Sequence, residues 1–356
     1  MFDPAAIQLP TADEEIWRYS RIDRLTPAAY AARQARTIVT GDETLWSHST
    51  GTSPISAPDV FAEANLSVAG EIKISVPART VVEAPIIITH HVAGGAAVAP
   101  RTVIELGRDA EATVVERFMS DDEESALCLP IVQTYLDDAA RLRYLGVNDL
   151  NEASWHIGHQ MAESGRDTSL LLSTVTLGGY YTRVRTDAAA RASGSQTRQV
   201  ALYFAAGEQM HDFRVIQRHE APHTSSDLLF KGAVQDRARS VYTGLISIDE
   251  TARQTTAHQT NRNLTLSEGA WAESVPNLDI RTNDVSCSHA STVGPIDAEQ
   301  RFYLESRGVP PAVAERLVVL GFFDEVIERL PQVDIVSDVR RRVAQRLSLS
   351  APEVVS

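Results

Sequence analysis

Short β-rich runs recur through the middle of this chain at a nearly constant interval. Four turn segments that precede such runs, spaced 29, 29 and 28 residues apart, begin at Asp109, Asp138, Asp167 and Ser195. Two similar segments begin out of phase, at Asp236 and Glu268. Repeats of about 20 to 50 residues indicate a solenoid, and strands without helices indicate a β-helix. Periodicity alone leaves a β-sandwich as the alternative.

Strand and helix signals divide the chain into three regions. Residues 61–296 are predicted to form strands almost throughout, because runs such as TVVEAPIIIT and SVYTGLISI are separated by Gly, Asp, Asn and Ser turns. The flanking regions, 1–60 and 297–356, are predicted to be mostly helical. Residues 51–59, GTSPISAPD, have the composition of a linker.

Capping signals support the two helical regions. Thr11 and Glu14 fit a capping box ahead of EEIWRYSRI, and Pro27 opens the alanine-rich stretch PAAYAARQA. Near the C-terminus, DAEQRFYLESRG and PPAVAERLVVLG are predicted helices that end at Gly308 and Gly321. The stretches FFDEVIERLP and DIVSDVRRRVAQRLS are predicted to continue in helix.

The charge balance limits the classes of partner. The formal net charge is −14 over 356 residues, which argues against nucleic acid and anionic membrane surfaces, because both attract basic patches. Neither a signal peptide nor an apolar run of about 18 residues is present in the sequence, so we expect a cytoplasmic protein. Without a GxxxxGK[ST] or GxGxxG motif, neither ATP hydrolysis nor dinucleotide binding by the common routes is expected.

One histidine motif matches the zinc-peptidase pattern HExxH, at His219, Glu220 and His223. On a helix the two histidines would share a face and bind zinc, with the glutamate as general base. Pro222 would then lie inside that helix, where it removes a donor and costs about 3 kcal/mol. The alternative interpretation is a turn whose histidines cap or pack.

Cys287 and His289 form the second candidate site. Residues two apart in a strand point to the same face, so a thiol and an imidazole would project side by side. They would make half a metal site, with further ligands from another chain. A buried cysteine beside a hydrogen-bonded histidine, or a cysteine nucleophile with a histidine base, are the alternatives. The chain has one other cysteine, Cys128, so it cannot supply a four-thiolate site alone.

The C-terminal half resembles the SufB/SufD family of the SUF iron–sulfur cluster assembly system. The resemblance is carried by TNRNLTLS, by the P-x-L-x-I run at 276–280, by CSHASTVG at 287–294 and by the FYLxSRG block at 302–308. Upstream, HEAPHTSSDLLFKG and the N-terminal EEIWRYSRIDRL are also similar to family segments. The SufD side of the family is favoured because Ala290 replaces the glutamate that SufB members tend to carry after the histidine.

The resemblance implies a mainly β fold, a right-handed parallel β-helix flanked by N-terminal and C-terminal helical regions. It implies a scaffold rather than an enzyme, pairing with SufB through the last β-helix strands. His289 matches the histidine implicated in cluster assembly at that interface, and Cys287 is a weaker candidate. The iron–sulfur cluster would be held transiently there, with no cofactor in the isolated chain.

The resemblance also implies that the SufC ATPase docks on residues 297–356. Partner-binding candidates in that region are Phe302, Arg307, Gly308, Leu320, Gly321, Phe322, Phe323 and Val326. Three alternatives remain: a purely structural subunit in which His289 has no ligand role, a zinc hydrolase that uses His219, Glu220 and His223, and a β-helical enzyme acting on an acidic polymer. The isolated chain is also a candidate homodimer, because an unpaired β-helix edge can pair with a second copy.

Overall fold

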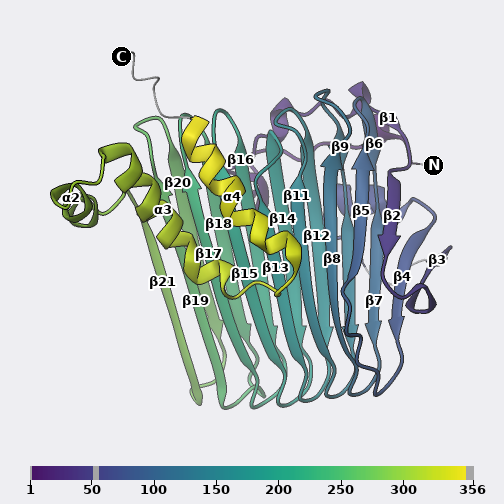
Figure 1. Cartoon of the computed structure of the whole chain (residues 1–356). Coiled ribbons are helices and arrows are strands. Elements are labelled where there is room, and N and C mark those ends of the chain that lie inside the picture. Colours follow the sequence, from purple (N-terminus) through teal and green to yellow (C-terminus); the bar gives the residue numbers. More distant parts are fainter. Residues whose placement is uncertain (1, 51–55, 350–356) are drawn as a thin grey trace.

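The computed structural model describes residues 2–50 and 56–349, and most of this chain forms one β-solenoid. The solenoid is parallel and has about 8 turns, and strands make up 47% of the chain (Figure 1). Each turn contributes strands to two facing sheets, named here sheet A, with 12 strands, and sheet B, with 9. The predicted β-helix is therefore confirmed, and the β-sandwich alternative is wrong.

Sheet A takes the first long strand of every turn. In chain order these strands are β4 (Glu71–Val76), β7 (Arg101–Leu106), β10 (Ile131–Leu136), β12 (Trp155–Ser164), β14 (Tyr181–Ala190), β16 (Met210–His219), β18 (Arg239–Ile248) and β20 (Trp271–Ile280). Three short strands join its side: β1 (Ala31–Ala32), β6 (Ala96–Val98) and β9 (Leu127–Cys128). Neighbouring solenoid strands are parallel and in register.

Sheet B takes the second long strand of every turn. These strands are β5 (Ile86–Val92), β8 (Glu111–Ser120), β11 (Arg141–Asp149), β13 (Ser169–Thr176), β15 (Gln196–Ala205), β17 (Ser225–Val234), β19 (Thr255–Thr265) and β21 (Val285–Gly294). Both faces of the central strands are buried, as their near-continuous apolar runs predict for a parallel sheet.

The two ends of the solenoid differ. At the first end, β2 (Arg36–Thr40) and β3 (Trp46–Ser49) pair antiparallel with β5 and β4, and so complete each sheet. At the other end, β20 pairs only with β18, and β21 pairs only with β19, among the strands of the described ranges. The solenoid therefore ends in two short antiparallel strands at one end and in two ten-residue parallel edge strands at the other, and the latter is called here the free end.

A left-handed residue stands where the chain passes from sheet A to sheet B in every turn but the last, between β20 and β21. Seven such residues have φ between 54° and 79°: Arg79, Asp109, Ala139, Asp167, Gly194, His223 and Gln254. Most of them donate their backbone N–H to a carbonyl of the next turn, as Asp109 does to Asp138 at 2.9 Å. This stacking satisfies the corner backbone, and it explains the interval of 28 to 29 residues found in the sequence.

The out-of-phase segments belong to the opposite corner. Asp236, with φ of 59°, lies between β17 and β18, where the chain returns from sheet B to sheet A. Glu268 lies in the equivalent connection between β19 and β20. The weak sequence repeat therefore arises from two columns of corners in one solenoid, one where the chain passes from sheet A to sheet B and one where it returns.

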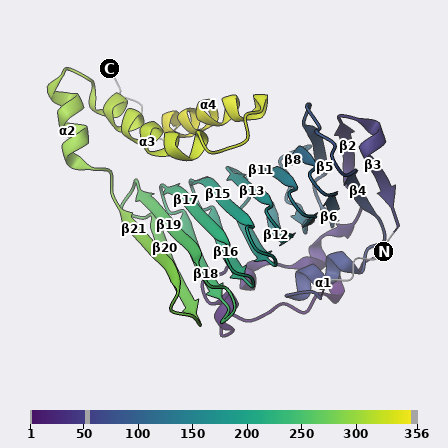
Figure 2. The same cartoon turned by 90° about the horizontal axis from the view of Figure 1, so that it is seen from below.

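Terminal segments cover the outer faces of both sheets (Figure 2). Helices α3 (Pro311–Ile327) and α4 (Asp334–Leu349) pack their apolar residues on the outside of sheet B. Helix α2 (Ala298–Ser306) projects past β21, beyond the end of the sheet. On sheet A, the N-terminal segment and α1 (Val60–Leu66) bury Trp17, Ile22 and Phe61. No helix in the described ranges combines the length and apolar character that a bilayer crossing requires.

The N-terminal region is less helical than its capping signals predict. Thr11 donates its backbone N–H to the Glu14 carboxylate at 3.1 Å, but only a single 3-10 turn follows, η2 (Glu15–Trp17). The stretch after Pro27 forms η4 (Pro27–Ala29) and then enters β1. The remaining 3-10 turns are η1 (Pro4–Ala6), η3 (Ile22–Arg24) and η5 (Glu43–Leu45). Of the predicted linker, residues 51–55 lie outside the described residues.

The C-terminal helices agree with the sequence except at one boundary. Gly308 ends α2 with φ of 87°, and α3 begins at Pro311, as predicted. Gly321 does not end a helix, because α3 continues to Ile327. Continuation places Phe323 and Val326 on the apolar outer face of sheet B, and their burial outweighs the glycine penalty of about 1 kcal/mol.

Candidate functional site

The free end of the solenoid places Cys287 and His289 on the last strand. In β21 they stand opposite Ala257 and Gln259 of β19. Val285 and Cys287 pack against the apolar cluster inside the solenoid, so alternate residues of this strand, His289 included, share the inner side. Cys287 is half-buried and His289 is exposed. The predicted pairing of a thiol and an imidazole on one strand face is thus what the fold provides.

The thiol of Cys287 is not activated in this chain. Burial raises its pKa, and the backbone hydrogen bond at Ala257 only partly offsets this effect. At neutral pH it is therefore a protonated thiol rather than the thiolate that binds metals or attacks carbonyls. Cys128 is fully buried, and burial raises its pKa further still. The nucleophile interpretation of Cys287 therefore lacks its activated sulfur.

Buried polar side chains lie behind His289, and this group, Gln259, Tyr242 and Ser274, is called here the polar column. Gln259, opposite His289, is 1% exposed, and neither of its amide atoms has a hydrogen-bond partner among the described residues. The hydroxyls of Tyr242 and Ser274 are also buried without a described partner. A Cβ on Gly244 would lie 2.5 Å from Gln259 Nε2 and 2.7 Å from the Tyr242 hydroxyl, so these two groups converge. Sequence patterns did not reveal this column, since its residues are scattered over three strands.

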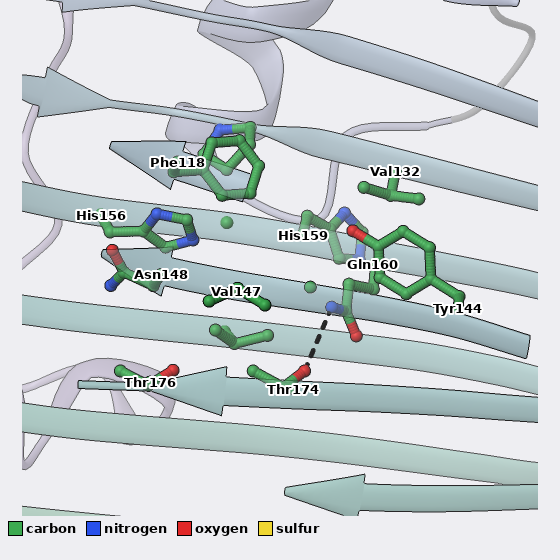
Figure 3. A pocket seen from close by; sticks show the side chains of 14 residues that line it. Phe118, Val132, Tyr144, Val147, Asn148, His156, His159, Gln160, Thr174 and Thr176 are labelled. Carbon is green, nitrogen blue, oxygen red and sulfur yellow. Dashed lines mark hydrogen bonds between the residues drawn. The ribbon is translucent and has the colours of Figure 1, made fainter. Parts of the chain in front are cut away.

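Deeper in the solenoid, polar side chains surround only a small cavity. Figure 3 shows His156, Asn148 and Gln160 around a cavity of about 20 Å³, which is room for roughly one water molecule. Gln160 Nε2 donates to the Thr174 hydroxyl at 3.3 Å, and burial lowers the pKa of His156 to about 4. A cavity this small cannot take a substrate.

The HExxH residues do not form a zinc site. His219 is the last residue of β16, and His223 has φ of 58° at a corner, so the two histidines do not share a helix face. His219 is fully buried, with Nδ1 and Nε2 bonded to the Thr224 and Ser226 hydroxyls at 2.8 and 2.9 Å. The glutamate pairs with Arg191 instead. The zinc-hydrolase interpretation is wrong because the motif is a strand and a corner.

No ready-made metal centre exists in the described part of the chain. Over residues 2–50 and 56–349, no group of three or more His, Cys, Asp or Glu side chains is placed to hold a metal ion. Cys287 and His289 are at most part of a ligand set.

The predicted partner-binding residues divide into buried and exposed groups. Phe323 and Val326 are 0% exposed because they pack against sheet B, so they hold α3 in place and cannot themselves touch a partner. Leu320 and Phe322 are half-buried, whereas Arg307, Gly308 and Gly321 are exposed. Phe302 is 70% exposed on the projecting helix α2.

Two further exposed apolar residues of the same region were not among the predicted partner-binding residues. Tyr303 on α2 and Leu317 on α3 are 59% and 46% exposed. An exposed aromatic pair on a projecting helix is a typical feature of protein interfaces. Helical periodicity did predict that Leu317 lies on one apolar helix face with Val318, Phe322, Val326 and Ile327, but only the fold shows that it is exposed and that α2 has no sheet beneath it.

Comparisons with known proteins identify the family. The family model "SUF system FeS cluster assembly, SufBD core domain" matches residues 88–322. A Mycobacterium tuberculosis protein described as an iron–sulfur cluster assembly SufBD family protein is 33% identical, over 96% of this chain and 89% of its own length. The chain belongs to the SufBD family of iron–sulfur cluster assembly proteins.

Within that family, proteins named SufD are among the relatives. Iron–sulfur cluster assembly protein SufD of Escherichia coli is 31% identical, over 68% of this chain and 58% of its own length. The Bacillus subtilis protein of the same name is 29% identical, over 75% of this chain and 63% of its own length. The chain is therefore a SufD-type member of the family.

Proposed function

We propose that this chain is a scaffold subunit that pairs with a SufB-type subunit through the free end of its solenoid. The observation that carries the proposal is that β20 and β21, ten residues each, have a sheet neighbour on one side only. Such edges present unpaired backbone groups and are templates for strand pairing with another chain. A SufB-type solenoid would extend both sheets and cover His289.

Cluster assembly at this interface would use His289 from this chain. His289 is exposed on the edge strand, and neutral imidazole is a suitable iron ligand. Because burial raises the pKa of the neighbouring Cys287 thiol, the thiolate would come from the partner. Iron and sulfide are cargo in this scheme, so the isolated chain needs no cofactor and acts as a scaffold rather than a catalyst.

The projecting helix α2 and the adjoining part of α3 would dock the SufC ATPase. Phe302, Tyr303 and Leu317 supply exposed apolar surface there, and buried Phe323 fixes the position of α3 on sheet B. Movement of the docked ATPase would then be transmitted to the solenoid through α3. In a pull-down with the ATPase, we expect Phe302→Ser to lose binding and Tyr19→Ser, at another exposed aromatic on the N-terminal segment, to keep it.

The decisive experiment is the native mass of this chain after anaerobic co-expression with its SufB- and SufC-like partners. We expect one copy of this chain with one SufB and two SufC subunits. A homodimer that ignores both partners would overturn the proposal.

In that complex, His289→Ala is expected to abolish cluster maturation without changing the mass. His258→Ala is the matched control, because His258 lies on the adjacent strand and bonds Ser288 on the outer side at 2.8 Å. Normal maturation by His289→Ala would favour the alternative in which this subunit is purely structural.

A further inference from the structure

A pocket of about 120 Å³ lies on the outer face of sheet A. Its floor is formed by β14, β16, β18 and the edge strand β20, and the N-terminal segment around Arg18 forms one wall. Three arginines line it, Arg18, Arg183 and Arg214, against two carboxylates, Glu15 and Asp212. We name it the arginine pocket. Its excess of positive charge contrasts with the net charge of −14 of the chain.

One wall of the arginine pocket is a neutralised and rigid ion pair. Arg183 is 2% exposed, donates to the Asp212 carboxylate and to the carbonyl of Ile16, and stacks 4.0 Å from the centre of the Trp17 ring. The Tyr181 hydroxyl also donates to Asp212, at 2.7 Å. Asp212 is thus fully engaged, and the buried Nε of Arg183 is left without a partner in the described residues.

Arg214 is the unusual residue of the pocket. It stands in register beside Arg185 of β14, and like charges in neighbouring positions on one face repel. Arg185 is compensated by Asp187, at 2.6 Å, but Arg214 has no hydrogen bond or ion pair within the described ranges. Burial lowers the pKa of Arg214, and Arg183 and Arg185 lower it further, whereas the nearby carboxylates of Asp212 and Glu15 raise it. A half-buried guanidinium without a bonded counter-ion is costly, so the position favours an anion.

The remaining donors suit an oxyanion. Thr243 of β18 stands in register beside Arg214, so the two backbones lie roughly 5 Å apart and both side chains line the pocket. Arg18 faces them from the N-terminal segment and has no described partner either. The volume is about six times that of the interior cavity in Figure 3, so the pocket has room for a small tetrahedral anion together with several water molecules. Arginine forks bind phosphate-like groups with charge-assisted hydrogen bonds.

We propose that the arginine pocket binds a small tetrahedral oxyanion of the phosphate class, held by Arg214, Arg18 and the Thr243 hydroxyl. This site is separate from His289 and does not depend on the proposed scaffold function. The bound anion would also tie the N-terminal segment to sheet A.

Titration of the purified full-length chain with inorganic phosphate, followed by calorimetry, tests the proposal. We expect saturable binding that Arg214→Gln weakens by about tenfold or more, equivalent to about 1.4 kcal/mol, and that Arg214→Lys weakens less. Arg198→Gln is the matched control, because Arg198 is an exposed arginine on β15 of sheet B with no described side-chain partner. Circular dichroism of each variant verifies that the solenoid is intact.

Two results would overturn the proposal. One is phosphate binding that is absent, or no stronger than chloride binding at equal ionic strength. The other is binding that Arg214→Gln and Arg198→Gln reduce equally. Acetate serves as the planar comparison: binding of acetate as tight as that of phosphate would show that the pocket takes carboxylates, which contradicts the tetrahedral class.

Discussion

Replacing His219 by glutamine should change how stability depends on pH. Burial lowers the pKa of His219 to about 4, whereas an unfolded histidine titrates near 6.5. Between these two pKa values, His219 is protonated in the unfolded chain and neutral in the folded chain. The free energy of unfolding therefore decreases as pH falls from about 6.5 towards 4. By linkage, the loss between about pH 7.5 and about pH 5 amounts to roughly 2 kcal/mol.

Glutamine has a donor and an acceptor that can replace both hydroxyl contacts of His219, but it does not titrate. Urea unfolding at the two pH values, followed by circular dichroism and tryptophan fluorescence, should show His219→Gln gaining about 2 kcal/mol relative to the native sequence at the lower pH. The exposed residue His48 provides the control, His48→Gln. An unchanged difference between His219→Gln and the native sequence at both pH values would refute the assignment of His219 as a buried neutral histidine.

Further predictions concern packing and helix docking. Gly232→Ala should destabilise the fold by about 1–3 kcal/mol, because the new Cβ would lie 1.9 Å from the Tyr203 ring. At Gly321 a new Cβ would have no atom within 4 Å, so Gly321→Ala should stabilise the fold by up to about 1 kcal/mol. Thermal unfolding measures both effects. Lys231→Met should weaken the packing of α3 on sheet B, because the buried ammonium donates to the Phe322 carbonyl at 2.9 Å and pairs with Glu325 at 2.6 Å. We expect faster proteolysis of residues 311–349 in this variant, and an unchanged cleavage rate would contradict the prediction. The native sequence should lose stability steeply between about pH 6.5 and pH 4.5, because burial also lowers the pKa of His156 to about 4 and of His211 to about 3; a flat profile by urea unfolding would contradict their burial as neutral imidazoles.

The solenoid could be predicted because the same left-handed backbone conformation recurs at its corners. A left-handed corner favours Asp and Gly, and Asp109, Asp167 and Gly194 fill three such positions. Ala139 and Arg79 fill others without any such preference, since stacking on the next turn imposes the conformation. The repeat was therefore visible but weak.

The N-terminal segment was mispredicted because local and tertiary forces compete there. Its capping contact between Thr11 and Glu14 forms, but Trp17 and Ile22 both bury themselves on sheet A, and one continuous helix would not direct both inward along that path. The placement of Cys287 and His289 at the free end was easier to predict. Strand alternation alone placed Cys287 and His289 together, whereas the burial of Gln259 behind them depends on which strand lies next in space.

The column of left-handed corners restricts how such a chain can change its length. Successive corner residues, from Arg79 to Gln254, are 27 to 31 residues apart, and six of the seven donate a backbone hydrogen bond to the turn beyond. Adding or removing one residue within a strand would move every later side chain to the opposite face. Adding or removing a whole turn would preserve both sheets, both corner columns and the terminal coverings. Insertions and deletions between members of this family should therefore come in units of a full coil, or be confined to the corners and the chain ends.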